Sequence, residues 1–151
     1  MKIVSGGQTG ADQGALDAAI ALGISHGGWC PLGRRSEAGR IPSRYQLSET
    51  ASSAYSERTE RNVVDSDGTL IVTRGTPTGG TAYTVELTRK HRRPHLVIDL
   101  DATDMNGAAR TVKEWLAESG VATLNVAGPR ASKHPTMADD VRRLLITALR
   151  P

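Results

Sequence analysis

Residues 2–10 read KIVSGGQTG, a short run of β-forming residues that passes directly into a glycine-rich loop. Residues 11–22 follow with apolar side chains at helical spacing, namely Leu16, Ala19 and Ile20. Gly23 then stands where a helix commonly ends in a left-handed residue. A strand, a glycine loop and a helix in this order predict the beginning of a βαβ unit.

The same order of elements recurs along the chain. We expect strands at residues 69–73, 95–100 and 121–126, and helices at residues 82–91, 106–119 and beyond Thr136, which resembles a capping box together with Asp139. Residues 26–29 could form a further strand. Because parallel strands need helical crossovers, this alternation predicts an α/β fold with a mostly parallel sheet and helices on both faces.

The composition describes one domain spanning residues 1–151. The chain is 38% hydrophobic and 23% charged and holds one cysteine, so we expect a core without disulfides or a structural metal. No segment resembles a signal peptide or an apolar span of about 18 residues, which favours a cytoplasmic protein with no membrane partner. Aromatic residues make up only 3% of the chain, which argues against a nucleic-acid partner because few bases could stack.

The net charge of +3 comes from one segment. Residues 30–45 contain Arg34, Arg35, Arg40 and Arg44 against the single acid Glu37, and the rest of the chain is balanced. Such a local cluster indicates either a small anionic ligand or a solvated surface loop.

Ligands of open parallel sheets bind beyond the carboxyl ends of the strands. Here those ends carry residues 5–10, 74–81 and 128–132, which we expect to converge on one crevice. The first loop matches neither a P-loop nor a dinucleotide fingerprint, and Asp12 could bind a ribose hydroxyl or a metal-bound water, or cap the helix. The second loop is the stronger candidate for phosphate, with a tight turn, in which Thr81 could be the helix cap, as the alternative.

The helix expected at residues 54–65 is heavily charged. Either its polar face is solvated, or Arg58 or Asn62 points at the crevice. Its thin apolar stripe of Tyr55, Thr59 and Val63 is a candidate contact in a homo-oligomer.

No protein-ligated metal is expected, because Cys30 and four scattered histidines lack ligand spacing. Cys30 is either a reactive thiol or a buried one.

Several motifs carry a family resemblance: SGGQTGAD at residues 5–12, GGWCPLGRR at 27–35, IPSRY at 41–45, TGGT at 78–81 and GPR at 128–130. Together the motifs resemble the molybdenum carrier proteins of the SLOG superfamily. The resemblance implies a Rossmann-like, doubly wound domain that associates with itself as a dimer or tetramer. It also implies a nucleotide or a phosphorylated pterin, such as the molybdenum cofactor, as ligand.

The same superfamily contains the Lonely Guy phosphoribohydrolases, which cleave nucleoside monophosphates. Their signature Pro-Gly-Gly-x-Gly-Thr-x-x-Glu, aligned on Gly80 and Thr81, places Thr84 at the catalytic glutamate. Glu86 would face away around the helix, so Asp12 or Glu49 would have to supply a carboxylate.

We favour a non-catalytic protein that binds a phosphorylated, nucleotide-like or pterin small molecule. An N-glycosidase of nucleoside monophosphates and a nucleotide-sensing module are the alternatives. The residues expected to bind the ligand lie in the three strand-end loops and in the basic segment: Gly6, Gly7, Gln8, Thr9, Gly10, Asp12, Arg34, Arg35, Arg74, Thr78, Gly79, Gly80, Thr81, Gly128 and Arg130.

Overall fold

A five-stranded parallel sheet forms the centre of the computed structural model, which describes residues 1–151. Its strands are β1 (Lys2–Val4), β2 (Ser25–Gly27), β7 (Gly68–Thr73), β8 (His95–Asp99) and β9 (Thr123–Ala127), in the order β2-β1-β9-β7-β8. Each neighbouring pair is parallel, as the alternating pattern predicts. The last strand in sequence, β9, therefore lies between β1 and β7.

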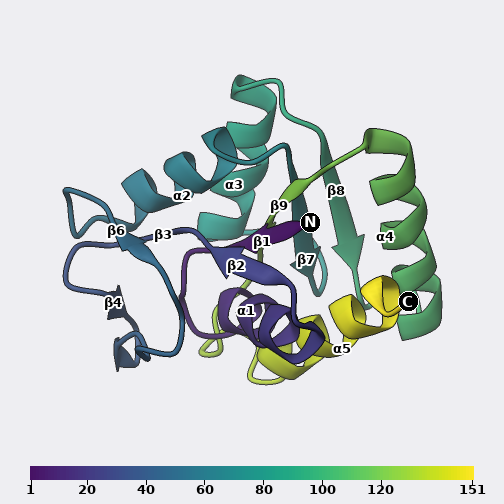
Figure 1. Cartoon of the computed structure of the whole chain (residues 1–151), viewed down its shortest axis with the longest axis horizontal. Coiled ribbons are helices and arrows are strands. Elements are labelled where there is room, and N and C mark those ends of the chain that lie inside the picture. Colours follow the sequence, from purple (N-terminus) through teal and green to yellow (C-terminus); the bar gives the residue numbers. More distant parts are fainter.

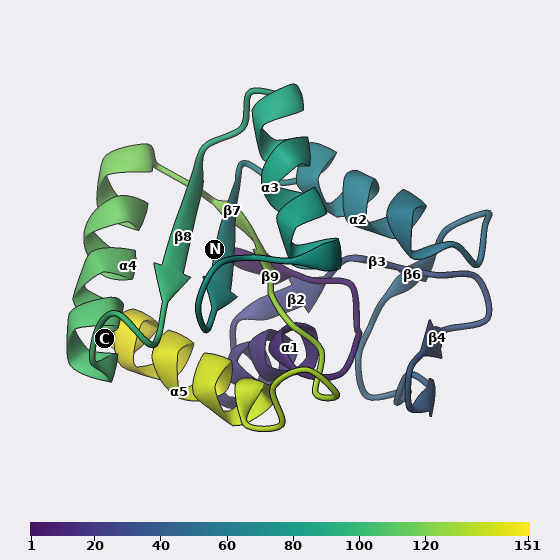
Figure 2. The same cartoon turned by 180° about the vertical axis from the view of Figure 1, so that it is seen from behind.

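Five helices cover both faces of this sheet (Figures 1 and 2). They are α1 (Ala11–Leu22), α2 (Tyr55–Val64), α3 (Gly79–Lys90), α4 (Met105–Ser119) and α5 (Met137–Leu149). Helices α1, α4 and α5 pack on one face and enclose the main hydrophobic core, whereas α2 and α3 lie side by side on the other. The expected Rossmann-like, doubly wound arrangement is confirmed. No helix combines the length and the apolar character needed to span a membrane.

Helix ends follow the sequence in some places and not in others. Gly23 and Gly120 close α1 and α4 in the left-handed conformation. The capping box expected at Thr136 is absent. Its Oγ1 donates to the Asp140 carboxylate and accepts no hydrogen bond from a backbone N–H of the helix. Helix α3 begins at Gly79, three residues before the predicted start, so Thr81 is not its cap.

The segment between β2 and α2 adds four short strands beside the sheet. Strands β3 (Trp29–Cys30) and β6 (Ser48–Glu49) pair in parallel, and β4 (Arg35–Ser36) and β5 (Gly39–Arg40) form an antiparallel hairpin. A small apolar cluster of Leu16, Cys30, Ile41 and Tyr45 fixes this segment to α1. The hairpin thereby comes to lie next to the carboxyl end of β1.

Candidate functional site

A cavity of about 230 Å³ opens between α2 and α3, over the carboxyl ends of β1 and β9. All three strand-end segments singled out in the sequence contribute to it. Its walls also include residues of α2 and of the loop that precedes α5. The lining residues are Gly6, Gln8, Asp12, Tyr55, Ser56, Arg58, Thr59, Asn62, Gly80, Thr81, Tyr83, Thr84, Asn125, Val126, Ala127, Gly128, Pro129, Arg130 and Lys133.

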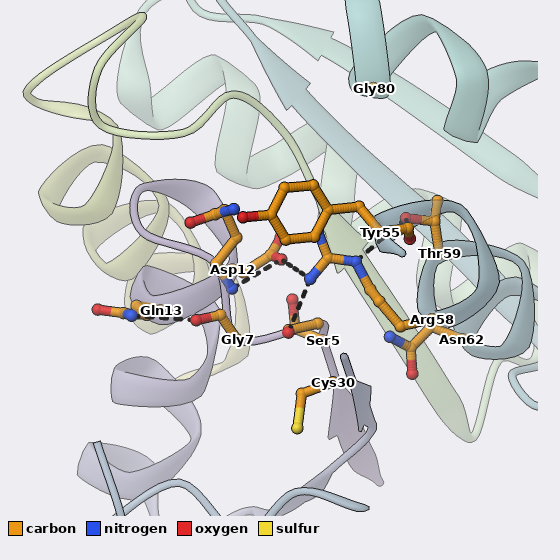
Figure 3. Close-up of polar contacts among 12 residues, drawn as sticks. Ser5, Gly7, Asp12, Gln13, Cys30, Tyr55, Arg58, Thr59, Asn62 and Gly80 are labelled. Carbon is orange, nitrogen blue, oxygen red and sulfur yellow. Dashed lines mark hydrogen bonds and ion pairs between the residues drawn. The ribbon is translucent and has the colours of Figure 1, made fainter. Parts of the chain in front are cut away.

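Arg58 crosses from α2 to the loop after β1 (Figure 3). Its side chain is buried, Nη1 donates to the Gly6 carbonyl at 2.9 Å, and Nε donates to Thr59 Oγ1 at 3.1 Å. A Cβ at Gly6 would lie 2.6 Å from Arg58 Nη1, so a larger residue there would displace the Arg58 side chain. Of the two alternatives for this helix, the structure therefore shows the one in which Arg58 faces the crevice.

Asp12 lies opposite Arg58, with 3.9 Å between its Oδ2 and Arg58 Nη1. The same oxygen accepts a hydrogen bond from the Gln8 N–H at 3.2 Å, so Asp12 binds the loop before α1 rather than capping the helix. Burial raises the pKa of Asp12, although the Arg58 charge and the Gln8 N–H act in the opposite direction. The cavity thus contains a carboxyl group that holds its proton more tightly than an exposed aspartate.

Some N–H groups of the first glycine loop and of the start of α1 are engaged within the chain. Besides the Gln8 N–H, the Thr9 N–H donates to Gln8 Oε1 and the Ala11 N–H donates to the Pro129 carbonyl. The N–H groups of Gly7, Gly10 and Asp12 donate no hydrogen bond within the chain, but the Asp12 carboxyl group lies beside them in the cavity wall.

The N-terminus of α3 has unpaired N–H groups next to a cation. The N–H groups of Gly79 and Gly80 donate no hydrogen bond within the chain, whereas those of Thr81 and Ala82 both donate to the Thr78 carbonyl. Nothing lies within 4 Å of the position that a Gly80 Cβ would take. Lys133 approaches from the loop before α5, with Nζ 2.8 Å from the Cβ position at Gly79. Two free N–H groups, a helix N-terminus and an ammonium group make this end of the cavity suitable for an anion.

The floor of the cavity is polar but uncharged. Asn62 of α2 and Thr84 of α3 stand on either side, and Asn125 of β9 lies below. The Asn62 amide accepts from the Trp29 N–H and donates to the Trp29 carbonyl, which ties α2 to β3. The Thr84 hydroxyl donates to the Gly80 carbonyl.

Seven of the predicted site residues line the cavity: Gly6, Gln8, Asp12, Gly80, Thr81, Gly128 and Arg130. Five others shape the adjoining turns without lining it: Gly7, Thr9, Gly10, Thr78 and Gly79. The remaining three are the arginines Arg34, Arg35 and Arg74, and the structure places all of them outside the cavity wall.

Two of these arginines bind other parts of the chain. Arg34 is buried and donates to the carbonyls of Ile41, Pro42 and Tyr45, which closes its own loop. Arg74 binds Asp101 and Asp140, which links the end of β7 to α5. Their side-chain donors are therefore directed to protein groups. Arg35 is exposed and stacks 4.4 Å from the centroid of the Tyr55 ring, on the rim of the cavity.

Glu37, at the tip of the β4–β5 hairpin, connects the basic segment to the site. Its carboxylate accepts hydrogen bonds from Thr9 Oγ1 and from both the N–H and the hydroxyl of Ser132, and lies 3.9 Å from Arg130. The two hydroxyl groups are the main reason that its pKa is lowered. The hairpin is thus fastened to the two loops that flank the cavity.

The carboxylates relevant to hydrolysis occupy different places. Thr84 stands in the cavity where the phosphoribohydrolase signature has glutamate, and Glu86 is exposed outside it, as the helical spacing predicts. Glu49 accepts the Gly33 N–H and does not line the cavity. Asp12 is the carboxylate that remains in the wall.

Cys30 is fully buried, and this burial raises the pKa of its thiol. Of the two alternatives, the structure shows the buried thiol. No cluster of three or more His, Cys, Asp or Glu side chains able to hold a metal ion occurs in the structure.

The sequence contains only weak signals for the lining residues that the prediction did not include. Asn125 stands between the apolar residues Leu124 and Val126 of a strand, and Lys133 follows Pro129 in the loop before α5. Tyr55 and Tyr83 stand on the two facing helices. An uncharged polar residue within a buried strand is the one signal that could have been used.

A parallel sheet covered on both faces, with a polar cavity at the carboxyl ends of its strands, defines the class of Rossmann-like ligand-binding domains. Within this class the chain belongs to the circularly permutated YpsA SLOG family, whose model matches residues 3–149.

A solved structure agrees with this membership. The crystal structure of a "Putative molybdenum carrier protein" from Syntrophus aciditrophicus SB is 48% identical in sequence. The match covers 98% of this chain and 94% of that one, with a TM-score of 0.96. The family resemblance seen in the motifs is thereby confirmed. A comparison with curated proteins found no match.

Proposed function

We propose that the protein binds a phosphorylated nucleotide-like or pterin molecule, such as the molybdenum cofactor, in the cavity between α2 and α3. The observation that carries this proposal is the open N-terminus of α3, where two unpaired N–H groups meet Lys133 at the edge of a polar cavity.

The phosphate is assigned to this N-terminus. Backbone N–H groups and the positive end of a helix bind phosphate oxygens, and Lys133 and Arg130 add charge from the facing loop. Arg130 is paired with Glu37 only at 3.9 Å, and its side chain is 41% exposed, so it is available to turn toward a phosphate.

The remainder of the ligand is assigned to the space between the two helices. Tyr55 and Tyr83 line this space, and aromatic rings pack against flat heterocycles. In the molybdenum cofactor the sulfurs of the pterin hold the metal, so a protein that carries it needs no metal ligands of its own. The name of the crystallised relative supports a pterin of this kind.

Asp12 favours a second candidate, an N-glycosidase of nucleoside monophosphates. A carboxyl group with a raised pKa can donate a proton to a departing base, and Asp12 is such a group within the cavity wall. Because Asp12 is engaged by Arg58 and Gln8 and no second carboxylate lines the cavity, we favour binding without hydrolysis.

Two measurements test these functions. Native mass spectrometry of the purified protein is expected to show a retained ligand whose mass contains a phosphate group. Incubation with AMP, GMP, CMP and UMP is expected to release no free base. Release that depends on the protein and disappears in Asp12→Ala would replace the carrier with the hydrolase.

A further inference from the structure

Asn125 brings a polar side chain into the floor of the cavity from the middle of β9. Its neighbours Leu124 and Val126 belong to the hydrophobic core, so the alternation of a strand directs Asn125 toward the opposite face, under α2 and α3. Only 3% of Asn125 is exposed, and it lines the cavity.

The amide of Asn125 is only partly paired. Nδ2 donates to Thr69 Oγ1 of β7 at 3.3 Å, while Oδ1 accepts no hydrogen bond within the chain. Two other polar residues of the cavity wall are bound elsewhere, since the Asn62 amide pairs with Trp29 and the Thr84 hydroxyl donates to Gly80. Asn125 Oδ1 is thus an acceptor in the cavity wall without a partner in the chain, a position from which it can accept a hydrogen bond from a donor of the ligand.

The charges in the cavity orient that ligand. Lys133 and Arg130 stand at its exposed edge, whereas the floor around Asn125 carries no charge. Asp12 and Arg58 are buried but lie opposite each other. A phosphorylated molecule would place its phosphate at the edge and a neutral group at Asn125.

We propose that Asn125 determines specificity by accepting a hydrogen bond from an N–H group of the ligand's heterocyclic ring. This inference rests on the proposed function. It selects rings with an amino or imino edge, a chemistry that guanine and pterin share in their 2-amino-4-oxopyrimidine ring. Ligands with the same phosphate but no ring donor would leave Oδ1 unpaired and bind more weakly.

Calorimetry with matched probes tests the proposal. GMP and purine riboside 5′-monophosphate share phosphate and sugar, but only GMP has ring donors, and dihydroneopterin monophosphate represents the pterin source. We expect GMP, the pterin probe or both to bind the wild-type protein about tenfold or more tightly than purine riboside monophosphate. The tighter of the two donor-bearing probes identifies the source.

Substitution of Asn125 should remove this preference. Asn125→Leu keeps the volume and loses the oxygen, and Asn125→Ala removes the same oxygen without adding bulk, in case the leucine variant does not fold. Both should bind the donor-bearing probe about tenfold more weakly and purine riboside monophosphate as before. Ala82→Val, which adds a side chain on α3 outside the cavity, is the control and should keep the preference.

The outcomes separate the two proposals. Equal wild-type affinity for probes with and without donors, or an equal loss for both in the Asn125 variants, would overturn the role of Asn125 and leave the phosphate site standing. Failure of the folded wild-type protein to bind any phosphorylated probe would overturn the proposed function and this inference with it.

Discussion

Three buried or half-buried arginines show how the surroundings of a residue decide its role. Arg34 and Arg58 are 9% and 8% exposed, and both donate to backbone carbonyls, but only Arg58 lines the cavity. Arg74 has its donors divided between two aspartates. The hydrogen bonds of a guanidinium group depend on which acceptors lie within reach of its side chain. For Arg34 these acceptors are three carbonyls of its own loop.

Arg34 and Arg35 form a matched pair for a stability measurement. Arg34→Ala should lower the free energy of unfolding by about 2–4 kcal/mol, because three carbonyl groups lose a charged donor. Arg35→Ala, at the exposed neighbouring position, should change it by less than about 0.5 kcal/mol. Urea denaturation of the two variants gives both values. Equal effects would mean that the Arg34 hydrogen bonds contribute nothing beyond those of a surface residue.

Glu37 makes the attachment of the hairpin dependent on pH. Its pKa is lower in the folded protein than in the unfolded chain, so its ionised form stabilises the fold above the unfolded value of about 4.3, and this contribution is lost as the pH falls through the folded pKa. Glu37→Gln should therefore be less stable than the wild-type protein at pH 7, with a difference that shrinks toward pH 3.

Thermal unfolding of both proteins across this pH range measures the difference. Tryptic cleavage after Arg35 or Arg40 in the hairpin should also become faster in Glu37→Gln at pH 7. A stability difference that does not change with pH would show that the carboxylate charge is not involved.

At the scale of elements, α1 and α3 both follow glycine loops and both keep unpaired N–H groups, but the carboxyl group of Asp12 stands at the first and the ammonium group of Lys133 at the second. The glycine pattern was sufficient to predict both turns and their place at the carboxyl ends of the strands. It could not predict that the Pro129 carbonyl accepts the hydrogen bond of the Ala11 N–H, because Pro129 is far away in the sequence and follows β9. The partners of Arg34 were not predictable for the same reason, since they depend on how its loop closes.

Gly80 allows the N-terminus of α3 to be tested separately. Gly80→Val should leave the fold intact, because nothing lies within 4 Å of the new Cβ, but its branches would block the approach of a phosphate to the N–H group. We expect at least about tenfold weaker binding of GMP and pyrophosphate by calorimetry. Ala82→Val is the control, because it adds the same kind of side chain to the same helical turn outside the cavity. Unchanged binding in Gly80→Val would reduce this loop to a turn.

At the scale of the whole molecule, the cavity exists because segments from every part of the chain meet at one edge of the sheet. Because β9 lies between β1 and β7, residues 125–133 are placed between the glycine loop and α3. The alternation of strands and helices predicted the layers, and the physical basis is simple, since apolar strands such as β7 must be covered on both faces. The strand order was not predictable in this way, because it depends on which buried surfaces fit together.

Self-association is the remaining prediction at this scale. We expect a dimer or a dimer of dimers, since closed symmetric assemblies predominate among soluble homo-oligomers. The structure does not support the apolar stripe of α2 as the contact: Val63 is fully buried, and Tyr55 and Thr59 line the cavity. Sedimentation equilibrium at micromolar concentration should give two or four times the chain mass of 16.0 kDa, and a species of 16.0 kDa would contradict the prediction. Val63→Ala should lower the stability by about 0.5–1.5 kcal/mol or more, as for other truncations in a packed interior, without changing this mass. A variant with unchanged stability and a smaller mass would instead return the stripe of α2 to the interface.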